Sequence, residues 1–243
     1  DKKKLSKRHG AASVMEYKNM GFYPEAVVNF LALLGWNPGD DREKMSIDEL
    51  IEAFSIENIS KKSGVFDLKK LEWLNGMFLR ERSNEELFED VGSLYVKCGY
   101  VTEEELESQR DYIMNVIELL KVRCRLITDF EEQGVYFFRD PETYDEKGVR
   151  KIFMKEGALE IIETLADLFD GMDSFGEKEL EDAVRRLAEE MGVGGGKLIH
   201  PTRLAVSGTT GGPGLFEMLA VIGKDRVVAR MRRAAAFISD AEK

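Results

Sequence analysis

Residues 102–125 read TEEELESQRDYIMNVIELLKVRCR, and this stretch decides the fold class. Thr102 is followed three residues later by Glu105, which is the capping-box pattern that begins many helices. Behind the box, apolar side chains recur every three to four residues: Ile113, Ile117, Leu120 and Cys124. This spacing predicts an amphipathic helix near 103–125.

Helix signals of the same kind recur along the rest of the chain. Further capping boxes are Ser46/Glu49, Ser83/Glu86 and Ser174/Glu177. Pro24 and Pro213 suit the first turns of helices that end at Gly35 and Gly223. Another helix, ending at Gly192, is predicted from an apolar repeat: Leu180, Val184, Leu187 and Met191. Since only Val135–Phe138 has strand character, we predict an all-α protein with little or no sheet.

Length and composition exclude several classes of protein. The 243 residues are 43% hydrophobic and 33% charged, enough for one large domain or two small ones. No run of about 20 apolar residues could span a bilayer, so no membrane partner is expected. The two cysteines, Cys98 and Cys124, and the two histidines, His9 and His200, lie too far apart in sequence for a zinc motif or a disulfide scaffold. No metal site is therefore expected.

The charge is distributed unevenly along the chain. Residues 1–80 carry 13 basic and 12 acidic side chains, residues 81–195 carry 14 and 30, and residues 196–243 carry 8 and 4. The net charge of −11 therefore resides in the middle of the chain. Because phosphate binding depends on local clusters of cations, a polyanion could still bind the ends or a basic patch in the middle.

Two segments near the N-terminus have unusual chemistry. Residues 4–10 read KLSKRHG, in which two lysines three residues apart flank a serine; such ammonium groups can stabilise a displaced pyrophosphate. The alternative is a basic, solvated terminus. Residues 65–76 read VFDLKKLEWLNG, in which Asp67 suits a helix N-cap. Taken alone, Phe66 and Trp73 are better explained as core residues than as a platform for RNA bases.

A third segment, residues 200–217, reads HPTRLAVSGTTGGPGLFE. A glycine-rich turn that leads into a helix presents free backbone N–H groups to an anion or a base edge. The segment lacks the Gly-Lys-Ser/Thr ending of a P-loop, so it is not expected to bind a nucleotide by itself.

In this order, the three segments resemble the C-terminal half of bacterial-type glutamyl-tRNA synthetases over nearly the whole chain. Residues 4–10 are similar to the class I signature loop, and residues 23–36 to the stretch that follows it. Residues 66–80 are similar to the family's stem-contact region, and residues 213–226 to its closing P-x-L-F-E…L-G-K-x-R pattern. In the family an ATP-binding Rossmann domain precedes the signature loop, and the sequence contains no His-x-Gly-His motif. The chain, which starts at Asp1, is therefore expected to begin inside a longer protein.

The resemblance implies roles for particular residues. In the signature loop, Lys4, Ser6 and Lys7 would bind ATP, and Lys7 would act in adenylate formation. In the anticodon module, the residues implied to contact tRNA are Arg123, Arg203, Pro213, Leu215 and Phe216. Since Cys124 stands where the family has phenylalanine, Arg125 is the alternative to Arg123. The planar guanidinium fork of arginine suits the edge of a splayed base, whereas a surface ion pair with the acidic middle is the competing role for each arginine.

The resulting expectation is an all-α protein of two consecutive modules, a signature loop and stem-contact domain over 1–80 and an anticodon-binding domain over 81–243. The implied function is that of the tRNA-binding portion of an aminoacyl-tRNA ligase, which attaches L-glutamate to tRNA(Glu) with ATP and Mg²⁺. Glutamate and ATP would be bound through the N-terminal domain, in a cytoplasmic monomer that does not bind DNA. The alternatives are a non-enzymatic helical scaffold for other proteins, or a paralogous synthetase that charges another tRNA.

Overall fold

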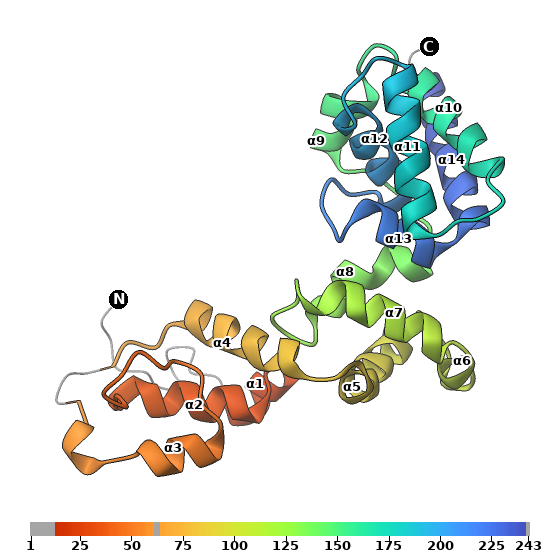
Figure 1. Cartoon of the computed structure of the whole chain (residues 1–243). Helices are drawn as coiled ribbons and strands as arrows, with labels where there is room; N and C mark the ends of the chain where they lie inside the picture. Colours follow the sequence, from red (N-terminus) through yellow and green to blue (C-terminus); the bar gives the residue numbers. More distant parts are fainter. Residues whose placement is uncertain (1–12, 61–63, 242–243) are drawn as a thin grey trace. The chain divides into compact units, whose positions relative to one another are not determined.

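The computed structural model describes residues 13–60 and 64–241, whose regular secondary structure is helical (Figure 1). They contain no strand, and the only β pairing among them is a single antiparallel bridge between Trp36 and Ile59. The all-α prediction is confirmed. None of the helices in this part of the chain is long and apolar enough to cross a bilayer.

The described residues divide into two compact units. Unit 1 comprises residues 13–60, 64–99 and 120–132, and unit 2 comprises residues 100–119 and 133–241. Near the predicted module boundary at residue 80, α4 ends at Glu81 and α5 begins at Asn84. The compact units nevertheless divide the chain at other positions. The functional division into a stem-contact module over 1–80 and an anticodon-binding module over 81–243 stays a prediction.

Unit 1 is built on two apolar clusters beneath short helices. Its helices are α1 (Val14–Asn19), α2 (Pro24–Gly35), α3 (Ile47–Ala53), the 3₁₀ turn η2 (Ile56–Asn58), α4 (Leu68–Glu81) and α5 (Asn84–Lys97). In one cluster, Phe22 and Phe30 pack against Leu71 and Leu74, so that α2 lies against α4. The other consists of Trp36, Met45 and Leu50, which join α2 to α3.

Unit 2 is a helical bundle around α14. Its helices are α6 (Glu103–Ser108), α9 (Glu146–Gly148), the π-helix η3 (Val149–Phe153), α10 (Ala158–Asp170), α11 (Glu177–Glu190), α12 (Gly196–Ser207), α13 (Leu215–Ile222) and α14 (Lys224–Ala241). Helices α7 (Arg110–Lys121) and α8 (Asp129–Phe138) contribute residues to both units. Helix α14 packs against α10 and α12 and buries Val227, Met231 and Ile238 between them.

The helix predicted over 103–125 is two helices. Helix α6 ends at Ser108, and Gln109 leaves the helical region with φ −102° and ψ 14° before α7 begins. The Gln109 N–H still donates to the Glu105 carbonyl, and the Gln109 carbonyl accepts from the Ile113 N–H of α7, so the chain bends at the backbone angles of Gln109 without losing these hydrogen bonds. Helix α7 ends at Lys121 because the N–H groups of both Arg123 and Cys124 fold back onto the Leu120 carbonyl.

The strand predicted at Val135–Phe138 is wrong, because these residues form the last turn of α8. β-branched and aromatic residues favour strands only through the surfaces they pack on. Phe137 is fully buried and Tyr136 is 5% exposed, both within unit 2. Tertiary packing of a helix therefore outweighs the local strand preference.

Three of the four predicted capping boxes are confirmed, those that begin with Ser46, Ser83 and Thr102. The Ser174/Glu177 box is wrong, because Gly176 is the N-cap of α11 and makes no side-chain cap. Helix α11 ends at Glu190, two residues before the predicted end.

Proline positions are confirmed at one helix and corrected at another. Pro24 begins α2, which ends at Gly35 as predicted. Pro213 does not begin α13, whose N-cap is Gly214. Asp67 caps α4 as predicted, and its carboxylate accepts hydrogen bonds from the N–H groups of Lys69 and Lys70.

Candidate nucleic-acid interface

The residues implied to contact nucleotides fall into three groups. Lys4, Ser6 and Lys7 of the signature loop lie outside the described residues, so the prediction of ATP binding stays untested. Arg123 lies in unit 1, in the loop between α7 and α8. Arg203, with the turn that follows α12, lies in unit 2.

Asn75 of α4 organises the loop that carries Arg123. Its side chain is fully buried, and both its amide oxygen and its amide nitrogen form hydrogen bonds. Its Oδ1 accepts from the Tyr23 N–H at 2.8 Å, and its Nδ2 donates to the Arg125 carbonyl. Asp129 holds the same part of the loop, because its carboxylate accepts from the N–H of Arg125 at 2.7 Å and from that of Leu126 at 2.9 Å. The loop backbone is therefore fixed at Arg125 and Leu126.

The side chains of Arg123 and Arg125 are both exposed, but they have different surroundings. Arg125 faces Glu72 of α4, with 3.9 Å between Nη1 and Oε2. No ion pair involves Arg123 within the described part of the chain. Cys124 between them is fully buried, and burial raises the pKa of its thiol. A base that binds Arg125 would have to compete with Glu72, whereas Arg123 has no ion pair to lose among the described residues.

The turn after α12 is held by side-chain hydroxyls. The Ser207 hydroxyl donates to the Arg203 carbonyl at 2.8 Å, and the Thr209 hydroxyl donates to the Gly211 carbonyl at 2.8 Å. The Thr209 N–H donates to the Ser207 hydroxyl at 3.2 Å. These bonds bring the turn back over the C-terminal end of α12, the helix that carries Arg203.

Arg203 lies directly against this turn. A Cβ placed at Gly212 would be 2.9 Å from Nη1 of Arg203 and 3.4 Å from the Tyr136 hydroxyl, and the φ of Gly212 is 149°. A side chain at this position would therefore have to displace the guanidinium. The structure thus places Arg203 beside this turn, while its contact with RNA stays a prediction.

The three other residues of the predicted anticodon set differ in exposure. Pro213 is buried, and Leu215 is 5% exposed at the start of α13. Phe216 is half-buried. Pro213 and Leu215 are thus placed to support the turn, and Phe216 has more of its ring accessible to a ligand.

Arg230 of α14 is a buried hub that the sequence analysis did not identify. Its side chain is 1% exposed and donates to three backbone carbonyls, those of Tyr136 and Val206 at 2.8 Å and that of Arg139 at 3.0 Å. Its Nε also donates to Asp140 at 2.8 Å. Arg230 therefore joins the C-terminal end of α8 to that of α12, close to the Arg203 turn.

The charge of the hub is balanced by Asp140. Burial alone would raise the pKa of Asp140, but hydrogen bonds from Arg230 and Arg233 outweigh it, so the pKa lies below its usual value. Burial lowers the pKa of Arg230, and Asp140 counteracts this effect. The only sequence signal for this hub was the closing family pattern, which ends at Arg226, one helical turn earlier.

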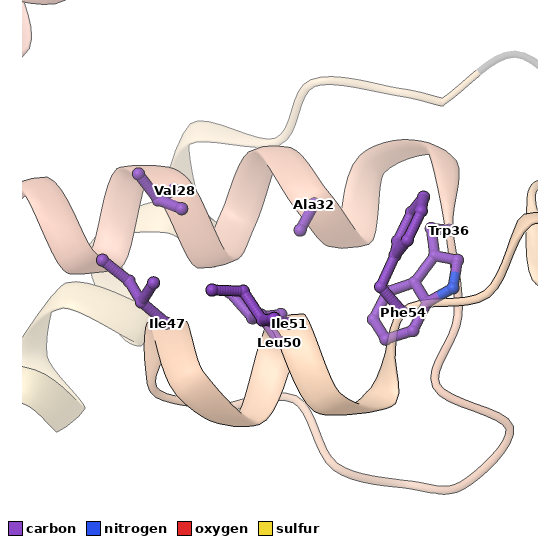
Figure 2. A pocket seen from close by; sticks show the side chains of 7 residues that line it. All are labelled: Val28, Ala32, Trp36, Ile47, Leu50, Ile51 and Phe54. Atoms are coloured by element: carbon purple, nitrogen blue, oxygen red, sulfur yellow. The ribbon is translucent and has the colours of Figure 1, made fainter.

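An apolar hollow of about 310 Å³ lies between α2 and α3 (Figure 2). Its lining is apolar and comprises Val28, Ala32, Trp36, Ile47, Leu50, Ile51 and Phe54. Figure 2 shows the Trp36 ring nitrogen at the edge of the group, pointing away from the other labelled side chains. The described residues that line the hollow bring no converging polar groups to it that could position a reactant. Among the residues described, no three His, Cys, Asp or Glu side chains are grouped as metal ligands.

Two protein-family models match this chain. A family model described as "Anticodon binding domain" matches residues 86–235. The chain belongs to this family. A second model, described as the catalytic domain of class I tRNA synthetases (E and Q), matches residues 1–73.

Similar proteins are glutamate–tRNA ligases. That of Desulforudis audaxviator is 41% identical over 98% of this chain, and glutamate–tRNA ligase 1 of Caldanaerobacter subterraneus is 39% identical over 99%. The chain spans about half the length of these curated relatives, 48% and 49%. A crystal structure of a glutamate tRNA ligase from Elizabethkingia meningosepticum superposes with a TM-score of 0.85 at 28% identity, covering 98% of this chain and 49% of that one. The resemblance to the C-terminal half of this family is confirmed.

Proposed function

We propose that the chain is the tRNA-binding portion of a glutamate–tRNA ligase, and that Arg203 and the Gly211–Leu215 turn read the anticodon. The observation that carries the proposal is the contact of the Arg203 guanidinium with Gly212, where a Cβ would be only 2.9 Å away. Anticodon bases are splayed out and recognised on their edges, which an arginine fork can contact with two hydrogen bonds. The turn places such a fork beside Gly212, where the absence of a side chain leaves room for the guanidinium.

The complete enzyme would attach L-glutamate to tRNA(Glu) in the cytoplasm, as a monomer that uses ATP and Mg²⁺. Lys7, with Lys4 and Ser6 beside it in sequence, would stabilise the charge on the displaced pyrophosphate during adenylate formation. Adenosine and glutamate would be bound by the Rossmann domain that precedes the signature loop in this family. The chain alone is therefore proposed to bind tRNA without activating glutamate.

A tRNA(Glu) titration of this chain tests the proposal. Binding should weaken at least 10-fold between about 50 and 200 mM salt, because bound phosphates displace counterions. Arg203→Ala should cost about 1–3 kcal/mol of binding, the value of a bidentate contact to a base. Arg203→Lys should recover little of this loss, because an ammonium cannot copy the fork. Affinity can be followed by fluorescence anisotropy and folding by the thermal midpoint.

Two results would contradict the proposal. If the chain does not bind tRNA at either salt concentration, the result would favour the alternative function of a helical scaffold. The acidic middle of the sequence is the evidence for that alternative. A fall in the thermal midpoint that matches the loss of binding in Arg203→Ala would instead identify this arginine as a structural residue.

Arg123 is proposed to select the tRNA. The glutamate and glutamine anticodons differ only in their third base, C or G, and an arginine can donate to the acceptors of cytosine. In the complete enzyme, Arg123→Gln should narrow the preference for tRNA(Glu) over tRNA(Gln) by roughly 10-fold, about 1.4 kcal/mol. The measurement is kcat/KM for both tRNAs.

Arg125→Gln is the matched control for this variant, because Arg125 faces Glu72 from the same loop. It should leave the ratio of the two kcat/KM values unchanged. If Arg125→Gln changes the ratio and Arg123→Gln does not, the assignment moves to Arg125. Equal charging of both tRNAs by the wild type would remove the discriminating role and favour a paralogous specificity.

A further inference from the structure

Residues 147–155 form a basic segment inside the acidic middle of the chain. The segment reads KGVRKIFMK and contains four cations and no acid: Lys147, Arg150, Lys151 and Lys155. All four side chains are exposed. None of them forms an ion pair with any residue in 13–60 or 64–241. The segment thus presents four cations to solvent, flanked directly by the exposed acids Glu146 and Glu156.

The local backbone brings these charges together. Helix α9 ends at Gly148 and continues as the π-helix η3, in which the Met154 N–H donates to the Val149 carbonyl at 3.0 Å. Lys147 and Lys151 are four residues apart, and like charges at this spacing lower the stability of a helix. A π-helical turn is rare and frequently occurs at functional sites. The charge repulsion and the π-helical turn therefore lower the local stability of the segment, and the requirements of folding do not explain why they are present.

The basic segment is attached to the turn that carries the proposed anticodon site. A Cβ at Gly148 would lie 2.8 Å from the Thr210 Cγ2 atom, and 3.0 Å from a methyl group of Leu204 beside Arg203. The Asp145 N–H also donates to the Gly208 carbonyl at 2.8 Å. Helix α9 accordingly lies next to α12 in Figure 1. A strand of RNA whose base contacts Arg203 would have its neighbouring phosphates close to this segment.

We propose that the basic segment, Lys147–Lys155, binds the phosphodiester backbone of the RNA strand whose bases are read at the Arg203 turn. The inference rests on the proposed function and adds a phosphate-binding site to it. Such contacts fix the register of a nucleic acid, whereas contacts to base edges provide the sequence specificity. The proposal also identifies what offsets the local charge repulsion, since bound phosphates neutralise the cations.

The test compares two double variants of this chain with the same change in charge. Arg150→Gln with Lys151→Gln removes two cations from the basic segment. Lys178→Gln with Arg186→Gln removes two exposed cations from α11, neither of which forms an ion pair in the described residues. Affinity for transcribed tRNA(Glu) is measured over a series of salt concentrations, and the thermal midpoint is measured for each variant.

The segment variant should bind tRNA about 10-fold more weakly near 0.1 M salt. The slope of log affinity against log salt should become less negative by about 1.4, the value of two single-strand phosphate contacts. Binding by the α11 variant should change less than 3-fold, on the order of the long-range charge effect alone. The thermal midpoint of the segment variant should be equal to that of the wild type or higher, because a like-charge repulsion is relieved.

Equal losses in the two double variants would overturn the inference, since the effect would then be one of total charge. An unchanged affinity in the segment variant, together with weakened binding by Arg203→Ala, would overturn the phosphate site and leave the proposed function standing. If the wild-type chain does not bind tRNA, the proposed function and the phosphate site both fail.

Discussion

Arg230→Met should lower the free energy of unfolding of unit 2 by about 4 kcal/mol, because it removes a buried guanidinium and leaves the backbone carbonyls that it bonds without their donor. The guanidinium is 1% exposed, and its loss leaves the carbonyls of Tyr136, Val206 and Arg139 without this donor. Each buried group left unpaired costs about 1–3 kcal/mol, while the apolar methionine recovers part of the packing. Urea unfolding followed by circular dichroism measures the change.

The matched control is Arg233→Met, which removes the other arginine that contacts Asp140. Its side chain is 51% exposed, so the expected loss is about 0–1 kcal/mol. Affinity for tRNA should fall with Arg230→Met at temperatures where the variant is still folded, because the residue holds the end of α12 that leads into the Arg203 turn. A loss below about 1 kcal/mol for Arg230→Met would show that the hub is not a stabilising element.

Acid titration provides a second measurement of the same hub. The pKa of Asp140 is lower in the folded chain than its usual value, so its contribution to stability is present above the unfolded pKa of about 3.9. This contribution is lost as the pH falls through the lower, folded pKa. Arg230→Met removes one of the donors that lower this pKa, so the stability of the variant should fall less steeply below about pH 4.

Asn75→Ala should destabilise unit 1 by about 3 kcal/mol, because the variant leaves two buried backbone groups without their partner. These groups are the Tyr23 N–H and the Arg125 carbonyl, which the amide of Asn75 joins. Since Arg125 belongs to the loop that carries Arg123, discrimination between the two tRNAs should also weaken in the complete enzyme. Unfolding in urea gives the first effect, and kcat/KM for the two tRNAs gives the second.

Two comparisons make the Asn75 result specific. Asn58→Ala changes an exposed asparagine of unit 1 and should leave stability within about 0.5 kcal/mol of the wild type. Asn75→Asp keeps an acceptor for the Tyr23 N–H but has no donor for the Arg125 carbonyl, so it should remain destabilised. Wild-type stability in Asn75→Asp would show that the bond to Arg125 is unimportant.

Local sequence was sufficient where a structural signal depends on a few neighbouring residues. The caps at Ser46, Ser83, Thr102 and Asp67 were predictable, because a side-chain oxygen two or three residues before a free N–H needs no distant partner. The family resemblance singled out Arg203 and the residues of the glycine-rich turn, and the structure places the Arg203 guanidinium against Gly212 of that turn.

Tertiary structure decided the features whose partners are distant in sequence. Val135–Phe138 has the composition of a strand, but the burial of Phe137 within unit 2 makes it the end of a helix. Arg230 reaches carbonyls about 90 residues away, and Asn75 reaches one 50 residues away. The positions of such buried donors depend on which backbone groups still need hydrogen bonds after the helices have packed. The sequence by itself thus determined the all-α class, most of the predicted helix caps and the family, and packing selected the polar residues that hold the candidate RNA-binding loops in place.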